Sequence, residues 1–155
     1  MGKRLYVIFA AAIFILVACG QKTQKLEQID RAEIIRLALD NYLTTTPENW
    51  RIVKNTWLKE KLDKKDTGDI FILDIRDPED FQKEHIQGAV NIPFKVLAKE
   101  ENLKKLPKDK TIVIVCVTGH SASMANVVLN LLGYKAVTMK YGMNCWKEAG
   151  FPVVK

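Results

Sequence analysis

Cysteine is scarce in this chain, since Cys19, Cys116 and Cys145 are its three cysteines among 155 residues. So few thiols do not make a disulfide-rich scaffold, and their spacing does not match that of a metal site. We therefore expect no metal and no cofactor. A chain of this length has room for one domain with a hydrophobic core large enough to fold without such cross-links.

A membrane-spanning hydrophobic run is also lacking. The apolar run over residues 5–18 is 14 residues long, which falls short of the roughly 20 that a transmembrane helix needs. It follows Lys3 and Arg4, and a charged start before a short apolar segment is typical of a signal peptide. We predict a signal peptide over residues 1–18.

The end of this segment, Leu16-Val17-Ala18-Cys19-Gly20, resembles the lipobox of bacterial lipoproteins. The resemblance implies that a lipidated Cys19 begins the mature chain and that residues 19–28 form a tether. We expect an extracytoplasmic protein, anchored by lipid to the cell membrane or to the periplasmic side of the outer membrane. The alternative is a secreted protein in which Cys19 has no special role.

A strong excess of charge is absent too. The net charge of +6 includes Lys3 and Arg4, so the chain from Cys19 carries 24 − 2 = 22 basic and 18 acidic residues, a charge of +4. Its lysine clusters lack the interleaved aromatic residues of a nucleic-acid platform. We expect no nucleic-acid partner, and we expect a monomer.

The remaining sequence alternates helix and strand patterns. Helical spacing follows Asp30 within an N-terminal helix assigned to residues 29–47, and recurs over residues 55–65. Nearly continuous apolar runs over residues 70–75 and 111–116 are typical of buried parallel strands, and shorter strands are expected at 50–53 and 136–139. A helix after Gly119 is predicted to bury the stripe Met124, Val127, Val128, Leu131 and Leu132. The pattern indicates an α/β fold with helices on both faces of a parallel sheet.

Cys116 ends one of these buried strands and begins the loop Cys116-Val117-Thr118-Gly119-His120-Ser121, which turns into a helix. Amide N–H groups of the loop and of the first helical turn, together with the helix dipole, favour a thiolate or a persulfide at this position. From the residues alone, a buried structural cysteine is an equally good interpretation.

Residues 74–93 contain Asp74, Arg76, Phe81, His85-Ile86, Gly88-Ala89 and Asn91-Ile92-Pro93, a pattern that resembles the rhodanese family. With the Cys116 loop and the closing segment 141–153, the resemblance covers residues 50–153, within a domain assigned to 48–155. It implies a five-stranded parallel sheet and a sulfurtransferase whose nucleophile is Cys116, with substrate bound by loop residues 117–121. Cys116 would accept sulfane sulfur and pass it to a thiophilic acceptor.

The loop also departs from related patterns. Phosphatases similar to this family carry an arginine six positions after the cysteine, where this chain has Ala122, so phosphoryl chemistry is disfavoured. Many single-domain sulfurtransferases carry an arginine where this chain has Ser121. Affinity for an anionic sulfur donor is therefore expected to depend on other groups.

Five further side chains are candidates for supporting roles. Asp74 and Arg76 are expected to form an ion pair that fixes neighbouring loops, with Arg76 a possible anion contact. His85 is expected to hold backbone groups at a turn, whereas His120 lies in the loop and is equally compatible with a role at a pocket rim or with solvent exposure. Cys145 is expected to pack beside Trp146, the alternative being that it approaches Cys116.

Three functions remain open at this point. The first is a sulfurtransferase that takes sulfur from a thiosulfate-like anion and delivers it to a thiol or cyanide through a persulfide on Cys116. The second is a module that carries or senses persulfide, or docks a partner, without turnover. The third is a thiol-disulfide protein that uses Cys116 and Cys145.

Overall fold

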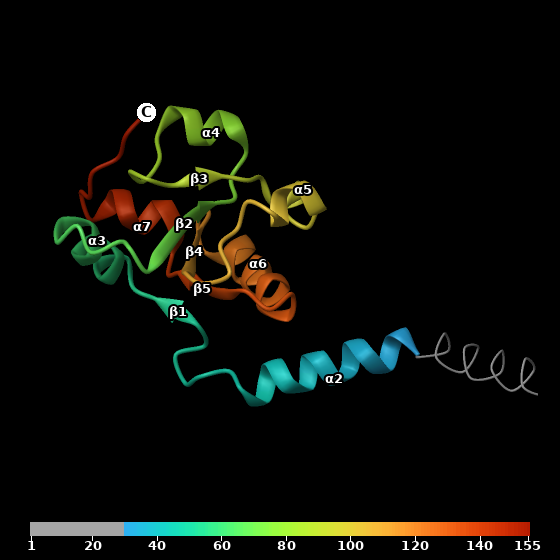
Figure 1. Cartoon of the computed structure of the whole chain (residues 1–155). Coiled ribbons are helices and arrows are strands. Elements are labelled where there is room, and N and C mark those ends of the chain that lie inside the picture. The colour runs from blue at the N-terminus through green and yellow to red at the C-terminus, as the bar shows by residue number, and fades with distance from the viewer. Residues whose placement is uncertain (1–29) are drawn as a thin grey trace, which may run out of the picture. The chain divides into compact units, whose positions relative to one another are not determined.

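The computed structural model describes residues 30–155 (Figure 1). The predicted signal peptide, Cys19 and the tether lie outside the described residues. The chain divides between Asn41 and Tyr42 into two compact units. None of the described helices is long and apolar enough to cross a membrane.

Helix α2, Arg31–Thr44, begins where the sequence predicts a helix start. The Asp30 carboxylate accepts a hydrogen bond from the Ala32 N–H at 3.0 Å, which satisfies one of the free amides of the first turn. The Glu33 carboxylate in the same turn pairs with the Arg36 guanidinium at 2.7 Å. No residue of α2 is buried.

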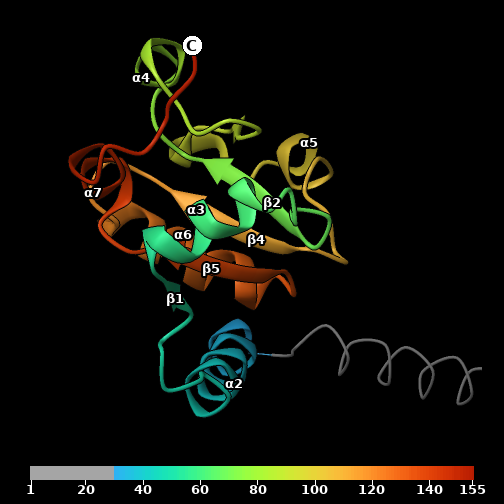
Figure 2. The same ribbon diagram turned by 90° about the vertical axis from the view of Figure 1, so that its left-hand side faces the viewer.

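The second unit contains a five-stranded parallel sheet in the order β1-β5-β4-β2-β3 (Figures 1 and 2). The strands are β1 Ile52–Val53, β2 Ile70–Asp74, β3 Val90–Asn91, β4 Thr111–Val115 and β5 Lys135–Met139. The two predicted apolar runs became β2 and β4, which pair along their whole length in the middle of the sheet. The predicted α/β fold with a five-stranded parallel sheet is confirmed.

The connections between strands are helical. They are α3 Asn55–Asp63, α4 Pro78–Lys83, the short 3-10 helix η1 Phe94–Val96, α5 Glu100–Leu103 and α6 His120–Leu131, and the helix α7 Gly142–Glu148 follows the last strand. In Figure 2, α3 lies in front of the sheet and α6 behind it. This arrangement confirms that helices cover both faces.

Two hydrophobic layers form because successive residues of a strand point to opposite faces. On one face, Leu73, Ile114 and Cys116 pack with Ala125 and Leu129 of α6. On the other face, Ile72 and Val115 pack with Leu58 of α3 and Trp146 of α7. The side chain of Cys116 therefore belongs to the α6 layer.

The predicted apolar stripe of α6 was wrong. Met124, Leu131 and Leu132 are exposed, whereas the buried residues of the helix are Ala122, Ala125, Asn126 and Leu129. Both sets have helical spacing, but small side chains let the helix lie close to the sheet, and the Asn126 amide donates to Thr138 Oγ1 at 3.1 Å. Hydrophobicity alone therefore selected the wrong face.

Candidate functional site

Cys116 lies directly after β4, at the carboxyl edge of the sheet, where parallel α/β folds bind ligands. Its side chain is 3% exposed. The loop that follows is more open, because Val117 and Thr118 are exposed before Gly119 returns to the interior. Chemistry at the sulfur therefore requires access through the loop.

Gly119 gives the loop its turn. Its φ of 93° lies in the left-handed region, which favours glycine, and its N–H donates to Cys116 Sγ at 3.1 Å. The sequence predicted several amides around the sulfur, but within the described residues Gly119 alone donates to it. The first N–H groups of α6 have no acceptor within the helix, so they remain available to an anion beside the loop.

The first turn of α7 fixes the loop through two backbone hydrogen bonds. The Met143 N–H donates to the carbonyl of Cys116 at 2.8 Å, and the Asn144 N–H donates to that of Val117 at 3.0 Å. Gly142 makes this approach possible, because a Cβ at this position would overlap the Cys116 carbonyl oxygen. Sequence reasoning missed this contact, although Gly142 stood in the closing motif as a signal.

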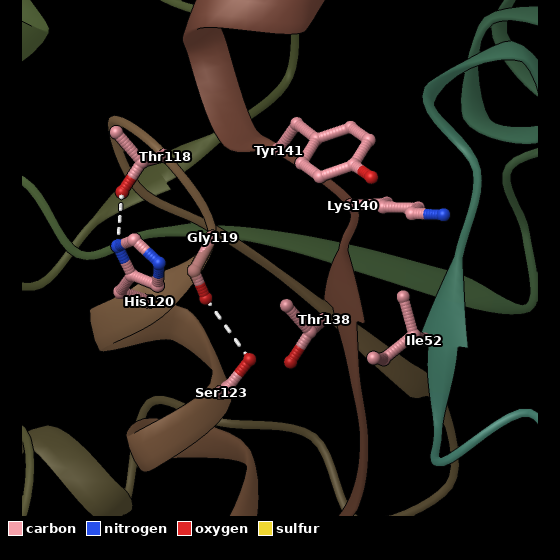
Figure 3. Close-up of a pocket in the computed structure, with 8 residues that line it drawn as sticks. All are labelled: Ile52, Thr118, Gly119, His120, Ser123, Thr138, Lys140 and Tyr141. Atoms are coloured by element: carbon pink, nitrogen blue, oxygen red, sulfur yellow. Dashed lines mark hydrogen bonds between the residues drawn. The ribbon is translucent and has the colours of Figure 1, made fainter.

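Two pockets flank the loop. The first, here called the Lys140 pocket, has a volume of about 180 Å³ and is shown in Figure 3. Its lining residues are Ile52, Thr118, Gly119, His120, Ser123, Thr138, Lys140 and Tyr141. The second, here called the Cys145 pocket, has a volume of about 390 Å³ and is lined by Thr118, His120, Tyr141, Asn144, Cys145 and Glu148. Cys116 itself lines neither pocket.

His120 lines both pockets, as do Thr118 and Tyr141. It is exposed at the start of α6, and its Nδ1 lies 3.1 Å from Thr118 Oγ1 (Figure 3). His120 therefore borders both pockets and is also exposed to solvent. Ser121, the neighbour that replaces the expected arginine, is half-buried, and Ala122 is fully buried.

Cys145 is half-buried on α7, and its thiol makes a polar contact instead of being buried in the core. Its Sγ accepts a hydrogen bond from Asn55 Nδ2 at 3.1 Å, and the same amide lies 3.2 Å from the Cys145 carbonyl. Cys116 and Cys145 are both free thiols. The Cys145 pocket brings this second thiol to the edge of the loop.

Asp74 and Arg76 form a buried ion pair at the end of β2, with Arg76 Nη2 2.6 Å from Asp74 Oδ2. The same guanidinium donates to the carbonyl of Glu84 at 2.7 Å. Asn91 closes the corner, since its amide donates to the carbonyls of Asp74 and Arg76. Neither charged residue lines either pocket beside the loop, so this geometry favours a structural role.

His85 holds backbone at a turn, as the sequence suggests. Its Nδ1 lies 2.9 Å from the carbonyl of Phe81, and its ring stacks on the Phe81 ring with centroids 3.9 Å apart. Its backbone pairs with Val154 in an antiparallel bridge. Among residues 30–155 there is no group of three acidic, histidine or cysteine side chains that could hold a metal ion.

Comparison with known proteins places these features in a family. The family model described as "Rhodanese-like domain" matches residues 54–149. Thiosulfate sulfurtransferase PspE of Escherichia coli is 37% identical over 84 residues, which cover 54% of this chain and 77% of that protein. A protein of Allochromatium vinosum named Sulfurtransferase is 29% identical over 90 residues, covering 57% of this chain and 82% of its own.

A solved structure and longer relatives agree with this assignment. A rhodanese-related protein from Thermoplasma volcanium superposes with a TM-score of 0.60 at 29% identity, over 67% of this chain and 97% of that one. Other relatives are longer proteins of which this chain spans 24% to 46%. Because the family model covers more than half of its length, this chain belongs to the rhodanese-like domain family, a membership that supports sulfurtransferase activity at the level of the family.

Proposed function

We propose that this protein moves sulfane sulfur from a thiosulfate-like donor to a thiophilic acceptor through a persulfide on Cys116. The observation that carries the proposal is the hydrogen bond from the Gly119 N–H to Cys116 Sγ, beside the free amides at the start of α6. A donor at this position stabilises negative charge on sulfur. The names of the relatives support the same class of reaction.

The proposed reaction has two displacements. The Cys116 thiolate attacks the outer sulfur of thiosulfate, the S–S bond of the donor breaks, and sulfite leaves with the bonding electron pair. The Cys116 persulfide then holds the sulfur, with its negative charge near the loop amides. An acceptor thiolate or cyanide attacks that outer sulfur and returns Cys116 as a thiolate. Neither step requires a general base or an external oxidant.

Intact-mass spectrometry tests this proposal. The wild-type chain is expected to gain 32 Da (about one sulfur atom) after thiosulfate and to lose it after cyanide, with thiocyanate as product. Cys116→Ser removes the attacking thiol and should lower turnover at least about 10³-fold. Cys145→Ser is the matched control and should still gain the sulfur. A Cys116→Ser protein with wild-type turnover would refute the proposal.

The same measurement separates the competing functions. A chain that gains the sulfur on Cys116 but never releases it to thiols or cyanide is a persulfide carrier. A chain that gains no sulfur, yet loses both thiols reversibly on mild oxidation, is a thiol-disulfide protein. In that last case Cys145→Ala would change the oxidation behaviour.

We also propose that the protein acts outside the cytoplasm, held to a membrane by lipid on Cys19. The support is the sequence alone, namely the apolar run of residues 5–18 that ends at Cys19. Cells fed labelled palmitate are expected to label the wild-type chain and not Cys19→Ala. Equal labelling of both would contradict the anchor.

A further inference from the structure

We propose that the Lys140 pocket binds the sulfur acceptor, and that this acceptor is a small aliphatic thiol carrying a carboxylate or a sulfonate. The inference rests on the proposed function, because it assigns a substrate class to the same site. It starts from the position of the pocket, whose wall includes Gly119. The N–H of that residue is the donor to Cys116 Sγ.

The position suits an attack on a persulfide. Cys116 Sγ is buried and lines neither of the two pockets beside the loop, but a persulfide extends the side chain by one S–S bond of about 2 Å. The outer sulfur then extends beyond Sγ by that length, and we expect it to approach the loop. Gly119 joins the two places, because its N–H contacts Cys116 Sγ and its backbone forms part of the wall of the Lys140 pocket.

The walls of the pocket suit an aliphatic body. Ile52 and Thr138, which pair across β1 and β5, offer methyl groups, and the Tyr141 ring closes another side (Figure 3). Cyanide would leave most of a 180 Å³ pocket unfilled. A thiol of a few heavy atoms would bury its carbons against these walls.

The charges of the pocket select an acid. Lys140 is the lysine among the lining residues, and no carboxylate lines the pocket. Eight other basic side chains of residues 30–155 have acidic partners within 4.0 Å: Arg36, Lys59, Lys61, Lys64, Arg76, Lys83, Lys104 and Lys147. Lys140 has no ion pair within that part of the chain and lies 4.9 Å from the Tyr141 ring.

The neighbouring pocket gives the contrast. Glu148 lines the Cys145 pocket, so a negatively charged acceptor would be repelled there and attracted by Lys140 in the Lys140 pocket. This chain has Ser121 where many single-domain sulfurtransferases carry an arginine. Lys140 is therefore the basic residue that the fold places in the pocket beside the loop. Its flexible stem lets the ammonium follow ligands of different length.

In the reaction, the acceptor thiolate attacks the outer sulfur of the Cys116 persulfide and forms a new S–S bond. The bond between that sulfur and Cys116 Sγ breaks, and its electron pair remains on Cys116 as the thiolate. The product is the persulfide of the acceptor. Lys140 takes no proton and contributes by holding the acid group of the acceptor.

The experiment uses the chain loaded to completion with thiosulfate and then freed of donor. Single-turnover discharge is measured with 2-mercaptoethanesulfonate and with cysteamine, each rate divided by that for neutral 2-mercaptoethanol. Lys140→Glu should lower the relative sulfonate rate and raise the relative cysteamine rate, so that their ratio falls at least about tenfold. Lys140→Met should give an intermediate ratio, and 0.5 M NaCl should weaken the wild-type preference.

Lys135→Glu is the matched control, because Lys135 is exposed at the opposite end of β5. It should keep the wild-type ratio. Equal ratios in wild type, Lys140→Glu and Lys135→Glu would overturn this inference while loading and cyanide discharge still support the proposed function. A wild-type chain that never gains 32 Da (about one sulfur atom) would instead overturn the proposed function itself.

Discussion

Two neighbouring corners at the same sheet edge carry reactive side chains, and they differ in how many internal partners they have. Asp74 pairs in register with Val115, the residue before Cys116. The Asp74–Arg76 corner directs its hydrogen bonds inward, and its side chains are 1% and 6% exposed. The Cys116 loop has one donor on its sulfur and exposed residues on either side of Gly119. We therefore expect the active residue in the loop, where hydrogen-bonding partners are left free, and not in the charged corner.

The largest effect on stability is expected for Arg76→Met. It leaves Asp74 buried without its cation, which should lower the free energy of unfolding by about 3–5 kcal/mol, as urea denaturation would measure. Sulfur transfer per folded molecule should stay near that of wild type. The control is Asp74→Leu with Arg76→Met, which should recover much of the stability. A tenfold rise in KM for thiosulfate in a stable Arg76→Met protein would show that Arg76 contacts the donor.

The α7 junction offers a sharper test of what shapes the loop. Gly142→Ala and Gly150→Ala both place a Cβ at positive φ, which should cost about 1 kcal/mol each. At Gly142 the Cβ also meets the Cys116 carbonyl, whereas at Gly150 it meets nothing within 4 Å. Gly142→Ala should therefore lower the free energy of unfolding by about 1–3 kcal/mol more than Gly150→Ala does. Persulfide loading should slow in Gly142→Ala alone, and equal effects would count against the junction.

The smallest effect is expected at an exposed ion pair. Lys61 Nζ lies 2.9 Å from Asp69, and this hydrogen bond lowers the pKa of the Asp69 carboxyl below its ordinary value. A lowered folded pKa stabilises the protein above the unfolded pKa, and that stability is lost as the pH falls below about 4. Lys61→Met should flatten this part of the stability curve without changing activity. An unchanged curve would show that the pair contributes nothing.

Sequence reasoning predicted that Asp74 and the Cys116 loop meet at one edge of the sheet because the signals for this arrangement are local. The apolar runs over residues 70–75 and 111–116 contain the strands β2 and β4, which end at Asp74 and Val115, and Gly119 marks the turn into α6. Parallel strands bring their carboxyl ends to one edge. These facts place Cys116, Asp74 and the loop together without knowledge of the strand order.

Other features depend on packing that no local pattern encodes. Strand β3 has two residues, Val90 and Asn91, too few to show a period. The buried face of α6 is selected by the close fit of Ala122 and Ala125 against the sheet. The contact between Gly142 and the Cys116 carbonyl joins segments 26 residues apart, and the lack of an ion pair at Lys140 appears only once all neighbours are placed.

The junction at Gly142 also bears on protein engineering. Because Met143 and Asn144 donate to carbonyls of Cys116 and Val117, the six residues from Cys116 to Ser121 take part of their shape from a segment that follows the last strand. Grafting those six residues into another scaffold would transfer the thiol without the α7 amides that hold the loop in its conformation. A transplant that works must carry residues 116–121 and 141–144 together.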